Sequence, residues 1–247
     1  MRPALLWLLL LMSTVAGAWP TRPVRVIATS PPGGSVDLLA RIAAEEFSKA
    51  FAQPFVVENR PGANGNIGAD LVVKALADGH MLFVAPPGPF SINAHLMASM
   101  PFDPRADIAP VALLGVSPLL LVVHPSVPAS NLSDLLAWLK ASEGKVNYAS
   151  QAVASTGHLA MELFKARAGV EATPWLGLGA RAGTPRDIVQ LLNEVVQRTV
   201  AKPETIKRLQ RIGIETRPMT PGEFAAFIRA ETNKWGDIIR RSGAKAE

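Results

Sequence analysis

Three loops of the chain combine small residues with the start of a helical pattern, and this combination can bind an anion. The loops are Ser30 to Asp37, Pro86 to Ile92 and Ser150 to His158. The first turn of a helix leaves backbone N–H groups unpaired and carries partial positive charge, so it can hold a carboxylate without a charged side chain. Gly33 and Gly34 let the backbone approach a ligand closely. Because plain helix capping explains any one such loop equally well, binding requires that several loops act together.

The side chains within these loops have two possible roles, structural or ligand-binding. Ser35 can cap the helix that follows it. Asp37 falls in the first turn of that helix, where a carboxylate stabilises the helix dipole, and we interpret it as a structural rather than a catalytic acid. His158 opens the helix after the third loop, where it either orients the loop by hydrogen bonding or contacts a ligand. The sequence leaves both roles of His158 open.

The usual catalytic and metal-binding patterns are missing from the sequence. None of the four histidines has an acidic partner at metal-ligand spacing, and the chain has no cysteine and no Gly-x-Ser-x-Gly motif. Gly62, Gly65 and Gly68 follow a Gly-x-x-Gly-x-x-Gly spacing, which matches a nucleotide-binding loop only loosely. We therefore expect no cofactor, no metal site and no enzyme, with a hydrolytic enzyme as a distant alternative.

The elements that position these loops form an α/β pattern, because short apolar runs alternate with amphipathic helical segments. The first three strands and the two helices between them predict a parallel sheet with right-handed crossovers. The predicted strands are Val24 to Thr29, Phe55 to Glu58, Met81 to Ala85, Val111 to Leu114, Leu119 to Val123, Val146 to Ala149 and Ile212 to Glu215. The predicted helices begin near Ser35, Ile67, Ile92, Asn131 or Ser133, His158, Thr184, Pro203 and Thr220.

The first 18 residues are typical of a secretory signal peptide. Arg2 precedes an apolar run from Leu5 to Val15, and Ala16-Gly17-Ala18 gives the small-x-small pattern that predicts cleavage before Trp19. The alternative is a transmembrane anchor, but the run is shorter than the ~20 residues that span a bilayer. Cleavage would leave 229 of the 247 residues, and the formal charge would fall from +5 to +4 with the loss of Arg2.

The composition of the remaining chain favours an exported soluble protein. The basic residues are scattered, without an arginine-rich block or interleaved aromatics, so a nucleic-acid partner is not expected. A mildly positive surface attracts anionic solutes. With no cysteine there is no site for a lipid anchor at the mature N-terminus, and we expect localisation in the periplasm.

Motifs along nearly the whole mature chain match the pattern of one protein family. The most specific are two neighbouring runs, Glu58 to Ala63 and Gly65 to Ala69. The others are Trp19-Pro20, Pro31 to Ser35 with Asp37, Ala77 to Gly79, Ile92-Asn93, Pro101 to Pro104, Asn147-Tyr148, His158 to Ala160, Ala182 to Pro185 and Phe224 to Ile228. With these motifs the chain resembles the Bug or TctC-type periplasmic solute receptors of tripartite tricarboxylate transporters.

This resemblance implies a periplasmic-binding-protein-like fold of two hinged α/β domains with a small dicarboxylate or tricarboxylate between them. It also implies membrane permease subunits as partners. The ligand-binding positions that it implies are Gly33, Gly34, Ser35, Asp37, Ser91, Gln151, Ser155, Thr156 and His158. Val36 stands where a threonine is common in the family, which removes one possible hydroxyl donor.

The chain departs from the family pattern after Val170, where about 70 residues of the second domain are absent and the sequence passes almost directly to Trp175. We therefore predict residues 1–18 as the signal peptide, 19–114 with 176–247 as a discontinuous first domain, and 115–175 as a reduced second domain. A remnant of this size is near the ~60 residues at which an isolated core becomes marginal. Two hypotheses follow: a working receptor, or a truncated, binding-impaired family member with no transport role.

Overall fold

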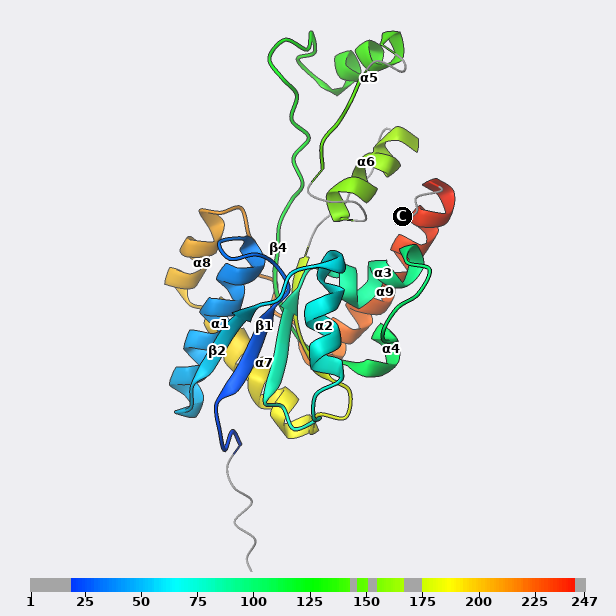
Figure 1. Cartoon of the computed structure of the whole chain (residues 1–247). Coiled ribbons are helices and arrows are strands. Elements are labelled where there is room, and N and C mark those ends of the chain that lie inside the picture. Colours follow the sequence, from blue (N-terminus) through cyan, green and yellow to red (C-terminus); the bar gives the residue numbers. More distant parts are fainter. Residues whose placement is uncertain (1–18, 143–145, 151–154, 167–174, 243–247) are drawn as a thin grey trace, which may run out of the picture.

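A five-stranded sheet forms the centre of the protein (Figure 1). The computed structural model describes residues 19–142, 146–150, 155–166 and 175–242. Within them the strand order is β2-β1-β3-β5-β4. The strands are β1 (Val24–Ala28), β2 (Phe55–Asn59), β3 (Met81–Ala85), β4 (Ile108–Val116) and β5 (Trp175–Arg181).

The first three strands confirm the predicted parallel arrangement. β1 pairs in parallel with β2, where Val26 lies beside Val57, and with β3, where Val26 lies beside Leu82. β5 then runs antiparallel to both β3 and β4. The carboxyl ends of β1 and β3 therefore meet at one edge of the sheet, which is where the first two small-residue loops leave it.

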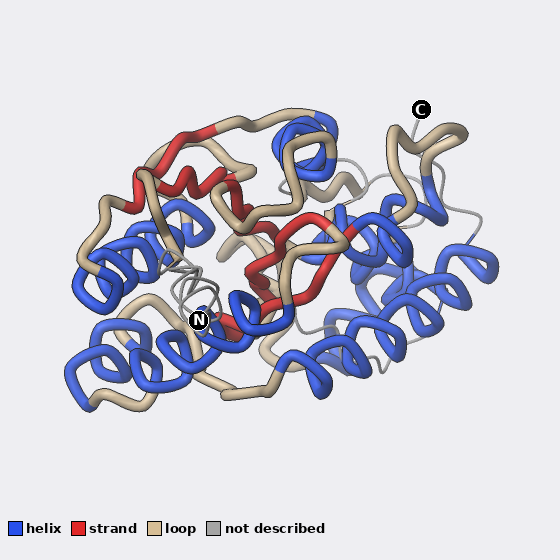
Figure 2. Tube along the Cα trace, turned by 90° about the horizontal axis from the view of Figure 1, so that it is seen from below, coloured by secondary structure: helices blue, strands red, loops and turns tan. Residues whose placement is uncertain are grey.

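Helices cover both faces of the sheet, giving three layers (Figure 2). One face carries α1 (Ser35–Phe51), α7 (Arg186–Val200) and α8 (Pro203–Gln210), while α2 (Asn66–Val73) and α9 (Pro221–Ser242) pack on the other. Short elements connect them: η1 (Ala63–Gly65), η2 (Gly88–Ile92), α3 (Asn93–Leu96), which follows η2 directly, and α4 (Pro104–Asp107).

The alternation of side chains along the strands explains these layers. Leu82 and Val84 of β3 lie in the core shared with α1 and α7, whereas Phe83 lies in the core shared with α2 and α9. Both faces are apolar because both are covered, which is the rule for parallel sheets. None of the helices in the described residues has the length and apolar character needed to cross a membrane.

A third apolar cluster joins α6 (Thr156–Ala166) to the helices beside the sheet. Leu159 and Leu163 of α6 are buried against Ile92, Leu96 and a stripe of α9 that includes Trp235. Figure 1 shows α6 beside α3 and α9. The helix that follows the third small-residue loop is therefore packed on α3 and α9.

The segment between β4 and α6 differs from the sequence prediction. No strand forms at Leu119 to Val123 or at Val146 to Ala149; both are irregular. Leu120 is 83% exposed and Val122 is 81% exposed. The run from Leu119 to Val123 is called the arm from here on. Beyond the arm, α5 (Leu132–Ala141) stands apart from the sheet in Figure 1. A strand needs a partner for its ladder of hydrogen bonds, and no neighbouring strand is available to these runs in the described chain.

Two further differences concern the strands of the sheet. The predicted strand from Ile212 to Glu215 is reduced to one bridge, between Glu215 and Val116. The strand β5 carries no usual strand signal, because glycines occupy alternate positions, Gly177 and Gly179. A Cβ atom at Gly177 would lie 2.5 Å from the ring of Phe224, and one at Gly179 would lie 2.5 Å from the ring of Phe83. Glycine is required there so that aromatic rings can pack directly on the backbone.

Candidate functional site

The first turn of α1 is open to solvent. The helix begins at Ser35, and the preceding Gly34 has an extended backbone and provides no side-chain cap. Residues 31–35 are all exposed. The N–H groups of a first helical turn have no partner within the helix, and they lie at its positive end. Because α1 is 17 residues long and fixed in the core, this end is an accessible and rigid set of donors.

Asp37 holds this loop in place from inside. Its side chain accepts hydrogen bonds from the Gly33 N–H at 3.0 Å and from Asn59 Nδ2 at 2.8 Å, and it pairs with Arg41 at 2.9 Å. Asp37 is only 5% exposed. The hydrogen bond from Arg41, aided by those from Gly33 and Asn59, lowers the pKa of Asp37 to about 2 against desolvation. Asp37 is thus an ionised anchor for the loop.

Because Asp37 holds the loop, some backbone donors of the first loop are already used within the protein and others are not. The N–H of Gly33 is already used by Asp37, and the positive φ of Gly33, +87°, is what turns the chain toward that carboxylate. Asn59, at the end of β2, also donates to the carbonyl of Ser30 at 3.1 Å. The donors left facing solvent are those at Gly34 and Ser35. The sequence analysis missed Arg41 and Asn59, although an arginine four residues after an aspartate on a helix is a readable signal.

Ser91, from the second loop, is enclosed. It lies in η2 and is fully buried. Its hydroxyl donates to the carbonyl of Pro87 at 3.1 Å. In this conformation Ser91 helps to close the turn and has no surface through which to meet a ligand.

Of the third loop, the described residues from Ser155 onward form the start of α6. The Ser155 hydroxyl accepts from the His158 N–H at 3.2 Å, as a helix cap does, and Thr156 is buried. His158 Nε2 lies 3.9 Å from Glu162 Oε1, which also accepts from the Tyr148 hydroxyl at 2.6 Å. Desolvation and the Glu162 carboxylate raise the pKa of Tyr148 to about 12, so Tyr148 stays a neutral donor. Gln151 lies outside the described residues.

The candidate residues therefore form separate groups. Gly33, Gly34, Ser35 and Asp37 lie together at the start of α1, and Ser155, Thr156 and His158 lie together at the start of α6. Within the described residues, no contact recorded for either group joins the two. No cluster of three or more metal-binding side chains occurs in that part of the chain either.

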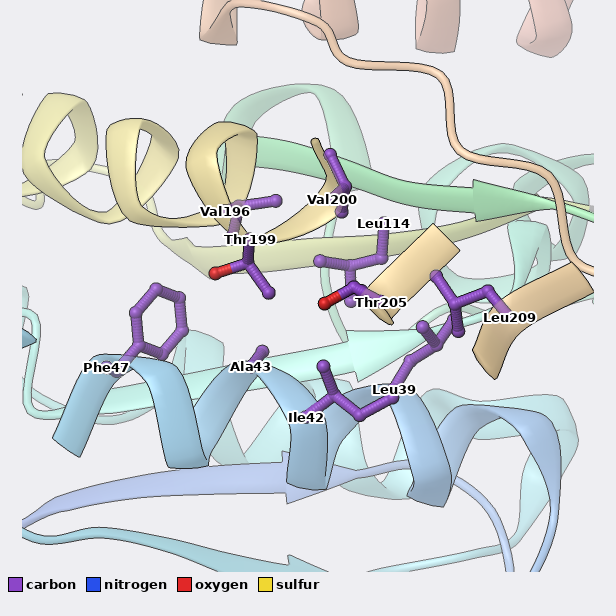
Figure 3. A pocket seen from close by; sticks show the side chains of 10 residues that line it. All are labelled: Leu39, Ile42, Ala43, Phe47, Leu114, Val196, Thr199, Val200, Thr205 and Leu209. Atoms are coloured by element: carbon purple, nitrogen blue, oxygen red, sulfur yellow. The ribbon is translucent and has the colours of Figure 1, made fainter. Parts of the chain in front are cut away.

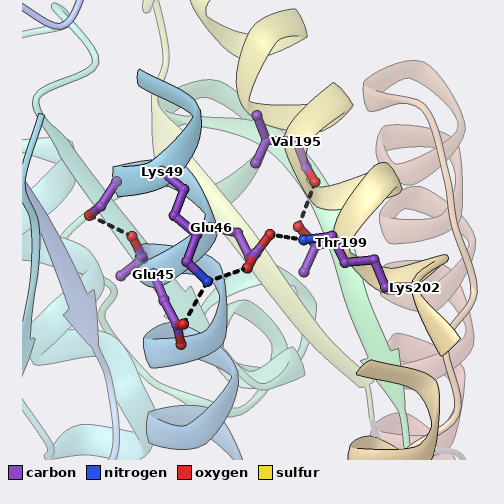
Figure 4. Close-up of polar contacts among 8 residues, drawn as sticks. Glu45, Glu46, Lys49, Val195, Thr199 and Lys202 are labelled. Carbon is purple, nitrogen blue, oxygen red and sulfur yellow. Dashed lines mark hydrogen bonds and ion pairs between the residues drawn. The ribbon is translucent and has the colours of Figure 1, made fainter. Parts of the chain in front are cut away.

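Two hollows in the described structure lie away from these groups. The first, of about 10 Å³, is an apolar gap between α1, α7 and α8; its lining includes Phe47, Leu114 and Leu209 (Figure 3). The second, of about 310 Å³, lies on the surface between α1 and α7 (Figure 4). There Lys49 lies 3.0 Å from Glu46, and Lys202 also pairs with Glu46 and keeps the pKa of that carboxyl below its usual value. Neither hollow offers a free ligand site of the expected kind.

The fold and the known proteins that it resembles define a class, the periplasmic-binding-protein-like solute receptors. Rpa4515 of R. palustris, solved with adipate, superimposes with a TM-score of 0.84 at 27% identity, over 92% of this chain and 99% of that one. MatC of Rhodopseudomonas palustris, solved with malate, gives 0.73 at 24% identity over 89% and 99% of the two chains, which shows the fold alone.

The sequence then gives the family. The pattern of the tripartite tricarboxylate transporter family receptors matches residues 39–173 and 167–244, and the chain belongs to this family. BugT of Bordetella pertussis is 28% identical, over 93% of this chain and 92% of its own. The family is one of receptors, and the chain is accordingly a receptor-type protein and not an enzyme.

The comparisons also confirm the internal deletion. The alignment with BugT is 300 positions long, and 93% of 247 residues fills about 230 of them, which leaves about 70 positions opposite gaps in this chain. The family match breaks at residues 167–173, around the Val170 position given by the sequence. The chain is thus a family member that lacks an internal segment.

Proposed function

We propose that the chain is a periplasmic receptor that binds a small dicarboxylate or tricarboxylate and delivers it to the permease subunits of a tripartite tricarboxylate-type transporter. Export depends on the leader at residues 1–18, cleaved before Trp19. Residues 19–114 and 176–247 form one domain and 115–175 a reduced second domain, with the ligand held at their junction.

The observation that carries this proposal is the solvent-open first turn of α1, fixed by the buried carboxylate of Asp37. Such a turn presents N–H groups and positive charge to an anion without a lysine or arginine. The remaining ligand contacts come from Gln151, Ser155, Thr156 and His158, once the parts close on the ligand. The enclosed Ser91 supports the turn before α3 and is not counted among them. The adipate in Rpa4515 supports a dicarboxylate as ligand.

A second candidate is a truncated receptor that no longer binds. The deletion of about 70 positions and the exposed apolar arm at Leu120 and Val122 favour it. One helix end contributes only about 0.3–1 kcal/mol when exposed and up to ~2 when partly buried, so useful affinity requires that several loops converge. If the second group cannot reach α1, the chain retains the family fold without the activity.

A thermal-shift experiment separates the two candidates. A ligand at 100 times its Kd stabilises the native state by about 2.7 kcal/mol, which corresponds to roughly 5–10 °C for a chain of this size. Adipate, succinate and citrate are the first probes. A shift of several degrees with one of them supports the receptor, whereas no shift with any, confirmed by calorimetry, supports the impaired form.

The variant Ser35→Asp locates the site. An aspartate in the first turn of α1 stabilises the helix by about 0.3–1 kcal/mol through the dipole. It also places a negative charge where the ligand carboxylate would bind. We expect the variant to fold at least as well as wild type and to lose the ligand-induced shift. The matched control is Ser133→Asp, an exposed position in the first turn of α5, where binding should be unchanged. Binding that survives Ser35→Asp places the ligand elsewhere.

A further inference from the structure

Three asparagines form a chain of amides between the start of α2 and the start of α3; Asn66 and Asn93 are buried, and Asn64 is half-buried. Asn93, fully buried, donates to the backbone carbonyl of Asn64 at 3.3 Å and to Oδ1 of Asn66 at 2.7 Å. Its own Oδ1 accepts from Asn64 Nδ2 at 2.7 Å. Because a backbone carbonyl can only accept, the orientation of the Asn93 amide is fixed, and Asn66 must turn its oxygen toward Asn93.

The amide nitrogen of Asn66 therefore faces two methionines. Nδ2 lies 3.0 Å from the sulfur of Met97 and 3.1 Å from the sulfur of Met100. Asn66 is buried, while both methionines are half-buried. A thioether sulfur is a weak hydrogen-bond acceptor. The Asn66 amide is therefore shielded from water while its N–H donors make only weak hydrogen bonds. The two N–H donors of the buried Asn66 amide thus face two sulfur atoms that can be oxidised.

We propose that Met97 and Met100 form an oxidation site whose methionine sulfoxide product is held by the Asn66 amide. The oxidant is a hydroperoxide such as hydrogen peroxide. A sulfur lone pair attacks one oxygen of hydrogen peroxide, and the S–O bond forms as the O–O bond breaks. The departing hydroxide takes the proton from the oxygen now bound to sulfur, which leaves water and the neutral sulfoxide. The sulfur loses two electrons and the peroxide gains them.

The product fits this place better than it fits an ordinary core. Methionine oxidation usually damages packing, because a polar sulfoxide replaces an apolar side chain. Here the new oxygen is a full acceptor for Asn66 Nδ2, and the partial exposure of both side chains gives the sulfur room to move outward. Asn66 is the first residue of α2, so the modification acts directly on the loop between β2 and α2.

Glutamine substitution tests the hydrogen bond without any oxidant. Glutamine is similar in length to methionine and carries an oxygen near the position of the sulfoxide oxygen. We expect Met97→Gln and Met100→Gln to keep the melting temperature within about 2 °C of wild type. The matched control is Met219→Gln, which should lose several degrees. Met219 and Met100 are both half-buried and packed on the same apolar core, and the difference between them is the Asn66 amide at the sulfur of Met100. Equal losses at all three positions overturn the proposal.

Peroxide treatment of the full chain then tests the modification itself. Peptide mass spectrometry should find the added oxygen on Met97 and Met100, and protein modified only there should melt within about 2 °C of the untreated protein. A second sample, the double variant Met97→Leu, Met100→Leu, retains Met81, Met161 and Met219 and should lose stability as these oxidise. The proposal fails if Met97 and Met100 stay unmodified after Met161 and Met219 have reacted, or if their oxidation lowers the melting temperature as much as oxidation of the others.

Discussion

At the residue scale, Asp37 shows how an apparent site residue acts through its neighbours. Its carboxylate contacts a backbone N–H, an amide and a guanidinium, and all three favour the charged form. The bound atoms belong to the protein, so Asp37 shapes the loop and leaves the outward donors of Gly34 and Ser35 to a ligand. From the sequence, Asp37 was interpreted as a structural acid because of the helix dipole. The structure adds three hydrogen-bonding partners that favour the same role.

This role makes stability depend on pH in a defined window. The folded pKa of Asp37, about 2, lies below its ordinary value of 3.8, so its contribution is present above pH 5 and is lost as the pH falls toward 2. The full shift corresponds to about 2.5 kcal/mol, and the half-exposed Arg41 reduces this by screening to about 1–2 kcal/mol. Chemical denaturation at pH 7, 5, 3 and 2 should show that loss.

The variant Asp37→Asn should remove this part of the acid sensitivity and be less stable than wild type at pH 7. The matched control is Asp187→Asn, which changes an exposed aspartate in the first turn of α7. That control should retain the wild-type slope between pH 5 and 2. An unchanged slope in Asp37→Asn would assign the acid sensitivity to other carboxylates.

At the element scale, the position of α9 depends on one buried carboxylate. Glu231 accepts from the indole N–H of Trp175 in β5 at 3.1 Å and from that of Trp235 in α9 at 3.0 Å. Lys234 also donates to Glu231 at 3.0 Å. The same helix carries the apolar stripe on which α6 packs. Glu231 therefore connects the sheet to the layer that holds the third loop.

Replacing Glu231 with alanine should destabilise the protein by about 2–4 kcal/mol, because two buried indole donors and a lysine lose their acceptor. Glu231→Gln keeps an oxygen in place and should cost less than half as much. Urea denaturation followed by tryptophan fluorescence measures both, since Trp175 and Trp235 report directly on the contact. Equal losses for the two variants would mean that charge, and not the hydrogen bonds to the indoles, is what matters.

Elements that depend on local interactions could be predicted from the sequence, whereas those that depend on residues distant in the sequence could not. β1, α1 and the loop between them were readable because their apolar period, glycines and capping residues are local. β5 was not, because its glycines make sense only against Phe83 and Phe224, which are distant in sequence. The start of α1 was likewise readable as a helix end that follows a glycine turn, whereas the packing of α6 on α9 depends on residues about 75 positions apart, such as Leu159 and Trp235.

At the scale of the whole molecule, the internal deletion explains the largest prediction error. Leu119 to Val123 has the composition of a strand, but a strand exists only where a second chain segment completes its hydrogen bonds. The family match breaks at residues 167–173, and the chain returns to the sheet at Trp175 without supplying a partner in the described part. The five-stranded sheet is unaffected, because its strands come from either side of the gap.

The arm should therefore contribute little to the stability of the fold. Leu120 and Val122 bury almost no surface, so Leu120→Ser with Val122→Ser should change the free energy of unfolding by less than about 0.5 kcal/mol. The matched comparison is Leu113, a leucine of the neighbouring strand β4 that is only 1% exposed. Leu113→Ala should lower the free energy of unfolding by about 2–5 kcal/mol. Both are measured by urea denaturation of the full chain. A loss above 1 kcal/mol for the arm variant would show that the segment is buried in solution, and the second domain would then be a packed unit able to close on a ligand despite its missing residues.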